Sequence, residues 1–328
     1  MSDTRKKIIL VCTPVDEIHG VLNRLHDKFS VIYLPNASLE DIHSLDTHNI
    51  WGIFTNPNRS KVYFGAEVFN LLPNLKVICT ASTGIVHIDS TLADLKNISI
   101  LSLKNETDFL MKVTSTADLA FTLMLNMIRK ITPASIDVLN GGWDCEKFIG
   151  RQVCDLNIGI LGFGRLGKIF ANHLSGFNSQ VSFFDPYVEF ATNQAKIVKI
   201  KNLKEFLQSL DVLSIHIHAT DKNIKYINKE FLSFCKKNIV IINTSRGEII
   251  DEADMVNFLK NNPGSSYATD VISDEIKNLH SSPILSYFKE VHPSNSIIVT
   301  PHIGGMSEGS RNLAYNKALD LLEDFIYE

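Results

Sequence analysis

The chain has 328 residues, of which 45% are hydrophobic and 21% are charged, and its formal net charge is −4 at pH 7. This length suggests two domains with well-buried cores, and the weakly acidic balance gives no sign of a nucleic-acid or membrane surface. No apolar run approaches the roughly 18 residues of a membrane span, and the N-terminus lacks a signal-peptide pattern. The five cysteines are odd in number and form no Cys-x-x-Cys, so we expect reduced thiols in a cytoplasmic protein.

The first part of the chain alternates between strand-like and helix-like segments. Repeated βα units predict a parallel sheet with helices on both faces, and ligands bind such sheets at the carboxyl ends of the strands. This rule singles out the loops at 55–59 and 81–84, although the first reads more readily as a plain turn. The predicted strands cover residues 8–12, 31–34, 50–55, 77–80 and 98–103, and the predicted helices cover 16–29, 39–48, 66–72 and 88–95.

A helical section and a second α/β section follow. The helix at 119–128 is apolar almost all round, with Ser115 or Thr116 as its cap, so we expect it to be buried in a core or in a contact between subunits. The later segments predict a second parallel sheet with intervening helices. Its predicted strands cover 157–161, 181–184, 197–200, 212–217, 239–243, 267–271 and 297–300, its helices cover 203–210, 229–234 and 253–259, and an amphipathic helix at 313–326 closes the chain.

Residues 157–185 form the most specific pattern in the chain. A short apolar run leads into Gly-Phe-Gly-Arg-Leu-Gly at 162–167, an amphipathic helix comes next, and a second apolar run ends in Asp185. This is the context that a dinucleotide-binding Gly-x-Gly-x-x-Gly motif requires. Its glycines permit a tight turn, backbone approach to a pyrophosphate and close helix packing, and the helix N-terminus attracts the phosphates. The residues predicted to bind the dinucleotide here are Gly162, Phe163, Gly164, Arg165, Leu166, Gly167 and Asp185.

Asp185 distinguishes between the two nicotinamide dinucleotides. Its carboxylate can bond both ribose hydroxyls and would repel a 2′-phosphate, so we predict NAD in preference to NADP. The turn also fits the Gly-x-x-x-x-Gly-Lys start of a triphosphate-binding loop. However, Ile169 stands where that loop needs a Ser or Thr hydroxyl for magnesium, which argues against an NTPase.

Three polar side chains in the second half stand out together. Arg246, Glu275 and His302 each lie beyond the carboxyl end of a different predicted strand. Taken singly, each would be an ordinary surface or turn residue. Because parallel strands end at the same edge of a sheet, we expect the three to converge on the nicotinamide end of the dinucleotide.

The chemistry of these side chains fits hydride transfer to or from a 2-hydroxy acid. The planar guanidinium of Arg246 can bind a carboxylate bidentately. His302 can remove the hydroxyl proton as the hydride leaves, and its charged ring can protonate the keto oxygen in the reverse direction. Glu275 would orient the ring and stabilise its charged form.

Two further pairs of residues have more than one interpretation. His216 and His218 lie on one face of the strand at 212–217, and their spacing could suggest a metal site. No other His, Cys or carboxylate cluster nearby supports that, so we predict no metal and favour a pocket wall. Arg59 and Lys61 either meet a phosphate or second carboxylate of the substrate or are ordinary surface cations, the commoner case.

At this point the chain resembles the D-isomer-specific 2-hydroxyacid dehydrogenases, which include D-lactate, D-glycerate, hydroxypyruvate and D-3-phosphoglycerate dehydrogenases. The resemblance rests on the glycine turn with Asp185, the Asn-Thr-Ser-Arg-Gly segment, the spacing from Asp270 to Glu275 and the Thr-Pro-His-Ile-Gly-Gly segment, and it covers essentially the whole chain. It implies NAD as the cofactor and a small 2-hydroxy or 2-keto acid as the substrate. The roles that it implies are Arg246 as carboxylate binder, His302 as acid and base with Glu275 as its partner, backbone amides at Ser82, Thr83 and Gly84 as further substrate contacts, and Thr244 and Asp270 as neighbours of the nicotinamide.

The resemblance also implies a domain layout. An NAD-binding Rossmann domain, a doubly wound parallel sheet at 105–299, would be inserted into a flavodoxin-like substrate domain formed by 1–104 and 300–328. Such proteins are usually homodimers that associate through the cofactor domains. Because only the short segment 303–328 follows His302, we expect no regulatory domain of the kind that long phosphoglycerate dehydrogenases carry. The particular acid stays open. The alternative from another class is a non-enzymatic NAD-sensing binding protein on the same fold, as in the C-terminal-binding corepressors.

Overall fold

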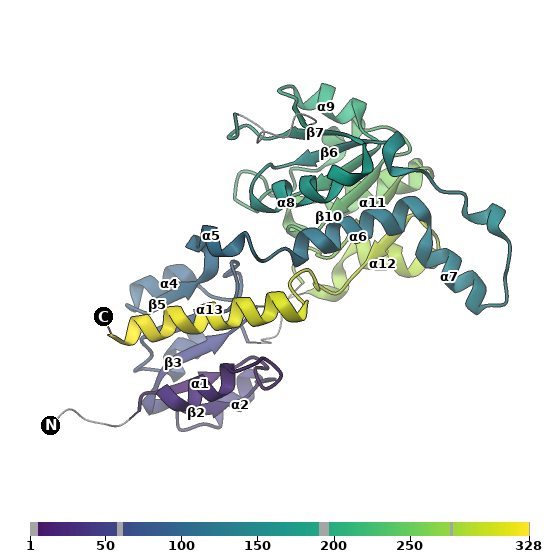
Figure 1. Cartoon of the computed structure of the whole chain (residues 1–328). Helices are drawn as coiled ribbons and strands as arrows, with labels where there is room; N and C mark the ends of the chain where they lie inside the picture. The colour runs from purple at the N-terminus through teal and green to yellow at the C-terminus, as the bar shows by residue number, and fades with distance from the viewer. Residues whose placement is uncertain (1–5, 58–61, 190–196, 276–277, 328) are drawn as a thin grey trace. The chain divides into compact units, whose positions relative to one another are not determined.

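The computed structural model describes residues 6–57, 62–189, 197–275 and 278–327, and the chain divides into two compact units. Unit 1 consists of residues 1–113 and 306–328, and unit 2 consists of residues 114–305 (Figure 1). The observed boundaries, 113/114 and 305/306, lie a few residues later than the expected 104/105 and 299/300. The first is later because Leu110 and Val113 pack in the core of unit 1. The second is later because the amides of Ile303 and Gly304 bond to Asp270 in unit 2.

Unit 1 is built on a five-stranded parallel sheet in the order β2-β1-β3-β4-β5, which is the flavodoxin-like doubly wound order. Successive residues of the central strands enter opposite cores: Ile9 and Val11 pack with α1 and α13, and Leu10 packs with α2 to α4. Both faces are therefore covered, as predicted for a parallel sheet. The elements are β1 (Ile8–Val11), α1 (Val21–Lys28), β2 (Ser30–Tyr33), α2 (Leu39–His43), β3 (Ile50–Thr55), α3 (Ala66–Leu71), β4 (Val77–Thr80), α4 (Ser90–Leu95), β5 (Ser99–Ser102), α5 (Thr107–Leu110) and α13 (Glu308–Tyr327).

Unit 2 is built on a seven-stranded parallel sheet in the order β12-β11-β10-β9-β6-β7-β8. From β8 to β11 this is the Rossmann strand order, which β12 extends by one strand. Helices α6 and α8 share one core with the sheet, and α9 to α12 share the other (Figure 1). The elements are α6 (Ser115–Arg129), α7 (Ile131–Leu139), β6 (Asn157–Leu161), α8 (Arg165–His173), β7 (Gln180–Phe184), β8 (Ile197–Lys199), α9 (Leu203–Ser209), β9 (Val212–Ile215), α10 (Lys229–Ser233), β10 (Val240–Asn243), α11 (Glu252–Asn261), β11 (Ser266–Thr269), α12 (Pro283–Val291) and β12 (Ile297–Val299).

Several element ends differ from the prediction for local reasons. The helix expected from residue 16 begins only at Val21, because Gly20 before it adopts a left-handed conformation with φ 77°. The strand expected at 212–217 ends at Ile215, so His216 and His218 do not lie on a strand. Helix α12 was not predicted, although its N-cap Ser282 followed by Pro283 at the first helical position is a strong start signal.

The burial of helix α6 explains why it is apolar almost all round. Ala120, Leu123 and Met127 are buried in the core of unit 2, which accounts for much of its apolar surface. The predicted cap was wrong: Thr114 is the N-cap, without a side-chain capping bond, and the Ser115 hydroxyl donates to the Gly304 carbonyl at 2.8 Å. Of the helices that the structure describes, none is long and apolar enough to cross a membrane.

Candidate active site

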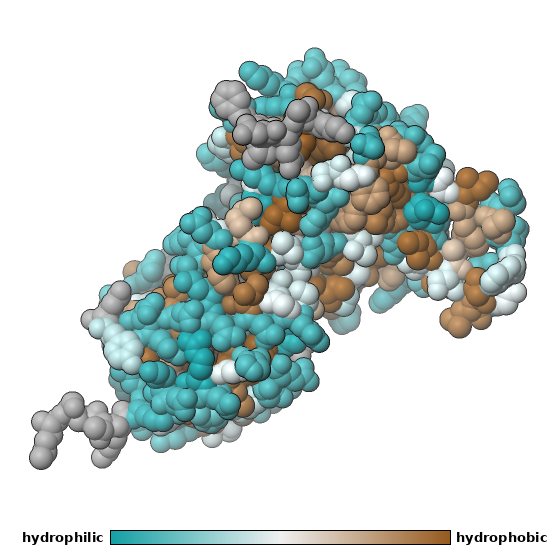
Figure 2. All heavy atoms as spheres, viewed as in Figure 1, coloured by the Kyte–Doolittle hydropathy of each residue, from teal (hydrophilic) through white to brown (hydrophobic). Residues whose placement is uncertain are grey.

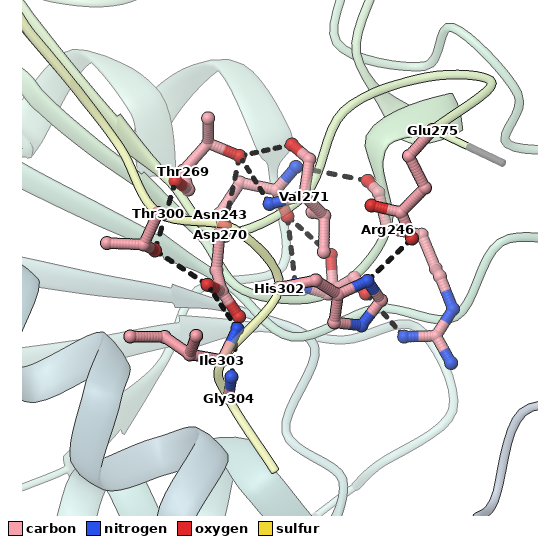
Figure 3. A network of polar contacts seen from close by, with 11 residues as sticks. Asn243, Arg246, Thr269, Asp270, Val271, Glu275, Thr300, His302, Ile303 and Gly304 are labelled. Atoms are coloured by element: carbon pink, nitrogen blue, oxygen red, sulfur yellow. Dashed lines mark hydrogen bonds and ion pairs between the residues drawn. The ribbon is translucent and has the colours of Figure 1, made fainter. Parts of the chain in front are cut away.

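Arg246, Glu275 and His302 come together because their loops leave neighbouring strands. β10, β11 and β12 are adjacent and parallel, so their carboxyl ends lie at one edge of the sheet. Arg246 follows β10, Glu275 follows β11 and His302 follows β12. Figure 3 shows the three side chains gathered at this edge. The structure thus places together the three residues that the sequence predicted to be catalytic.

His302 and Glu275 form a close pair. The Nδ1 atom of His302 lies 2.5 Å from Oε1 of Glu275, and the two side chains are 24% and 25% exposed. Because Nδ1 is engaged by the carboxylate, Nε2 is the ring atom left for proton transfer to another molecule. The carboxylate also fixes the orientation of the ring.

The backbone of His302 is held in an unusual conformation by Asp270. His302 has a left-handed φ of 54°, which is uncommon for a residue with a side chain. The Asp270 carboxylate accepts bonds from the amides of Ile303 at 2.8 Å and Gly304 at 2.7 Å and from the Thr300 hydroxyl at 2.6 Å. Burial raises the pKa of Asp270. The sequence predicted Asp270 as a neighbour of the nicotinamide, and this second role in shaping the His302 loop was not foreseen.

Asn243 shapes the turn that carries Arg246. Its side-chain amide donates to the Arg246 carbonyl at 3.0 Å, and its side-chain oxygen accepts from the Ser245 amide at 3.0 Å and hydroxyl at 2.7 Å. Arg246 is half-buried, and its guanidinium donates to the Ser245 carbonyl at 2.7 Å. Among the described residues this is the one bond that the guanidinium makes, and it leaves most of the five guanidinium N–H groups for an anionic ligand.

The three glycines of the turn differ in what a side chain at each position would meet. Gly162 has a φ of 90°, and a Cβ there would lie 2.8 Å from the His216 carbonyl oxygen. A Cβ on Gly167 would lie 2.3 Å from the Gly162 oxygen, so only glycine lets α8 approach the sheet this closely. Gly164, the N-cap of α8, has open space where a Cβ would stand.

The remaining residues of the turn differ in what their side chains can reach. Phe163 is buried and stacks on Phe183 with ring centroids 4.1 Å apart, so only its backbone is open to a ligand. Leu166 packs against the core of unit 2. Arg165 is half-buried, and burial lowers its pKa.

Asp185 is held beside the turn. Its carboxylate accepts bonds from the amides of Phe163 and Tyr187, both at 2.8 Å. A carboxylate oxygen can accept more than one bond, so each oxygen keeps capacity for a ribose hydroxyl. The sequence predicted the ribose contact but not these two backbone bonds.

These features fit a bound dinucleotide. The open space at Gly164 lies at the N-terminus of α8, where no side chain caps the helix, which suits a pyrophosphate. Thr244, predicted to border the nicotinamide, is 5% exposed, and its buried hydroxyl has no partner among the described residues. A buried hydroxyl without a partner is costly unless a ligand completes it.

The predicted substrate loop lies after β4 in unit 1. The Ser82 hydroxyl donates to the Gly84 carbonyl at 2.7 Å, and the Leu103 amide donates to the Ser82 carbonyl at 2.9 Å. Among the described residues, none accepts a hydrogen bond from the amide of Thr83 or Gly84. The Ser82 amide already donates to the Thr80 carbonyl at 2.8 Å, so of the three predicted donors only the amides of Thr83 and Gly84 are open at the carboxyl edge of this sheet.

Of the residues that the sequence left with more than one interpretation, His216 is described by the structure, and Arg59 and Lys61 are not. His216 is half-buried, its Nε2 lies 2.8 Å from the Ser214 hydroxyl, and its ring packs on Phe170. Burial lowers its pKa to about 3, so the ring is neutral near pH 7. Arg59 and Lys61 lie outside the described residues.

Comparison with known proteins places these features in a family. Residues 121–304 match the model of the NAD-binding domain of D-isomer-specific 2-hydroxyacid dehydrogenases. The chain is 28% identical over 266 residues to the D-3-phosphoglycerate dehydrogenase of Bacillus subtilis, a match that covers 81% of this chain and 48% of that protein. It is 29% identical over 252 residues to the glyoxylate reductase of Pyrococcus horikoshii, covering 75% of this chain and 71% of that protein.

A solved structure agrees on the fold. The D-lactate dehydrogenase of Aquifex aeolicus, complexed with NAD and lactic acid, matches with a TM-score of 0.79 over 98% of this chain and 95% of that chain, at 22% identity. The chain spans about half the length of the phosphoglycerate dehydrogenase that it matches. The family match spans more than half of the chain and includes the glycine turn, Asp185, Arg246, Glu275 and His302. The resemblance read from the sequence is confirmed: the chain belongs to the D-isomer-specific 2-hydroxyacid dehydrogenase family and contains its NAD-binding domain.

Proposed function

We propose that the protein is an NAD-dependent oxidoreductase that interconverts a D-2-hydroxy acid and its 2-keto acid. The observation that carries this proposal is the 2.5 Å contact between His302 and Glu275, gathered with Arg246 at the strand ends of an NAD-binding domain (Figure 3). Phosphoglycerate, glycerate and hydroxypyruvate are the substrates that we place first, since a D-3-phosphoglycerate dehydrogenase and a glyoxylate reductase are among the relatives.

The roles of the residues follow from their chemistry. Arg246 binds the substrate carboxylate through the N–H groups that its bond to Ser245 leaves available. In oxidation, Nε2 of His302 accepts the hydroxyl proton, and Glu275 stabilises the resulting imidazolium at Nδ1. When bound, NAD would supply the hydride acceptor for the carbon that bears this hydroxyl. In reduction, His302 returns its proton to the keto oxygen.

The test is turnover with a panel of 2-keto acids and NADH, followed by its loss in a His302→Asn variant. The panel contains pyruvate, hydroxypyruvate, glyoxylate and phosphohydroxypyruvate. Removing a general acid should lower kcat by about 10²–10⁴-fold while the dissociation constant of NADH stays nearly unchanged. His26→Asn is the matched control, because His26 is exposed on α1.

Two outcomes would contradict the proposal. If His302→Asn retained parental turnover, His302 would not be the acid. If the parent bound NADH but reduced no acid of the panel, the non-enzymatic NAD-sensing protein would become the better reading. Both outcomes are read from the same purified preparations.

We also propose that the protein is cytoplasmic, because its cysteines are expected to be reduced.

We further propose that the protein forms a homodimer through the surface of α7 and the segment after it. No residue of α7 is buried, and Leu139 and Trp143 are 84% and 89% exposed. Figure 2 shows hydrophobic side chains over α7 and the segment after it. A large exposed apolar patch of this kind favours association with a partner, and a second copy of the chain supplies the same surface.

A further inference from the structure

Glu252 is a buried carboxylate that the proposed reaction does not use. It is the first residue of α11, after the N-cap Asp251, and it is only 7% exposed. Burying a carboxylate is costly unless hydrogen-bond donors replace the lost water. Its partners therefore indicate what this residue holds in place.

The two oxygens of Glu252 accept hydrogen bonds from two serines, one before and one after Glu275 in the chain. We call the stretch that begins at Ser273 and includes Glu275 the Glu275 segment. Oε1 accepts from the Ser273 amide at 2.8 Å, and Oε2 accepts from the Ser282 hydroxyl at 2.5 Å. Ser273 precedes Glu275 by two residues, and Ser282 is the N-cap of α12. One side chain thus ties the start of the Glu275 segment to the start of the following helix.

A second contact holds the same peptide group from the Arg246 side. A Cβ on Gly247 would lie 1.9 Å from the Ile272 carbonyl carbon and 2.3 Å from the Ser273 nitrogen. The backbone next to Arg246 therefore packs directly on the peptide whose N–H donates to Glu252. Movement of this peptide would displace Glu275 relative to both Arg246 and His302.

We propose that Glu252 is a positioning residue: by holding Ser273 and Ser282, its carboxylate fixes Glu275 at hydrogen-bond distance from His302. This inference rests on the proposed function for its catalytic consequence. The hold of Glu252 on the Ser273 amide can be measured without turnover. Displacement of a catalytic group by about 1 Å can cost about 10²-fold in rate, so a small shift of Glu275 has a large effect.

The test compares Glu252→Ala with Glu252→Gln. We expect Glu252→Ala to lower kcat by about 10–10²-fold, with the KM of the keto acid and the dissociation constant of NADH changed by less than about threefold. Glu252→Gln should restore most of the loss, because its amide can still accept from Ser273 and donate to Ser282. Hydrogen exchange at the Ser273 amide should accelerate in the Ala variant and stay slow in the Gln variant.

A double-mutant cycle separates positioning from general stability. If Glu252 acts through Glu275, Glu252→Ala should cause little further loss of kcat in a Glu275→Gln background. Equal fold-losses in the two backgrounds would overturn the proposal. Glu230→Ala is the matched control, since Glu230 is an exposed glutamate in the first turn of α10 and should leave kcat unchanged.

The remaining outcomes are also distinguishable. If Glu252→Ala does not fold, Ser282→Ala removes one of the two donors and should lower kcat in the same direction. Unchanged exchange at Ser273 in a folded Glu252→Ala variant would overturn the positioning role, whatever the turnover. A parent without turnover on any keto acid would instead contradict the proposed function, and the exchange experiment would still test the hold on Ser273.

Discussion

Asp185 links a single side chain to the choice of cofactor. Its two oxygens accept backbone bonds from Phe163 and Tyr187, which fix the carboxylate beside the glycine turn. We predict that Asp185→Ser raises the ratio of kcat/KM for NADPH to that for NADH by about tenfold or more, equivalent to about 1.4 kcal/mol of lost repulsion and lost ribose bonding. The measurement is steady-state kinetics with both cofactors. The exposed Asp155→Ser is the control, and an unmoved ratio would show that Asp185 does not bind the ribose.

His87 gives unit 1 a pH-dependent stability. It is 1% exposed, and burial lowers its pKa to about 4 from an ordinary value of 6.5. Between these values the unfolded chain binds a proton that the folded chain does not, so the free energy of unfolding falls as the pH falls. We predict that, between pH 6.5 and pH 4, this residue contributes up to about 1.4 kcal/mol per pH unit to the decline in the free energy of unfolding.

The check on His87 is urea unfolding at pH 7.5 and pH 5 of the parent and of His87→Gln. The variant should lose less stability than the parent between these two pH values, because glutamine does not titrate. The exposed His26→Gln should keep the parental dependence. Identical pH dependence in parent and His87→Gln would contradict the assignment.

At the scale of elements, helix α7 and the residues that follow it to Trp143 form the surface through which we expect two copies of the chain to associate. Burying a large apolar side chain contributes about 1.5–3 kcal/mol, so losing two from a symmetric contact removes them from both copies. We predict that Leu139→Asp together with Trp143→Ser converts a dimer into a monomer in sedimentation velocity. Leu95→Asp is the control, since Leu95 on α4 is 75% exposed in unit 1. A parent that sediments as a monomer at all concentrations would contradict the proposed dimer.

Element types were predictable where a pattern is local. β3 and β4 have the predicted bounds because apolar runs between turns leave little choice. Element ends were less predictable, because they depend on single residues such as Gly20, whose left-handed backbone delays the start of α1. Helix α12 was missed although its Ser-Pro start was visible in the sequence.

At the scale of the whole molecule, strand order decides which residues meet. Arg246, Glu275 and His302 are far apart in the chain, and they gather because β10, β11 and β12 are neighbours in the sheet. The sequence predicted this convergence from a general rule of parallel sheets and from family motifs. Their mutual distances required the folded chain.

The sequence by itself determined the α/β fold, the dinucleotide turn, the family and the residue types of the proposed reaction, because each depends on patterns within short segments. Only the tertiary structure decided which groups hold those residues in place. Asp270 holds the His302 loop and Glu252 holds the Glu275 segment through bonds to residues more than twenty positions away. Such bonds leave no periodic pattern in the sequence, because a carboxylate at a helix start looks the same whether it faces water or a buried amide.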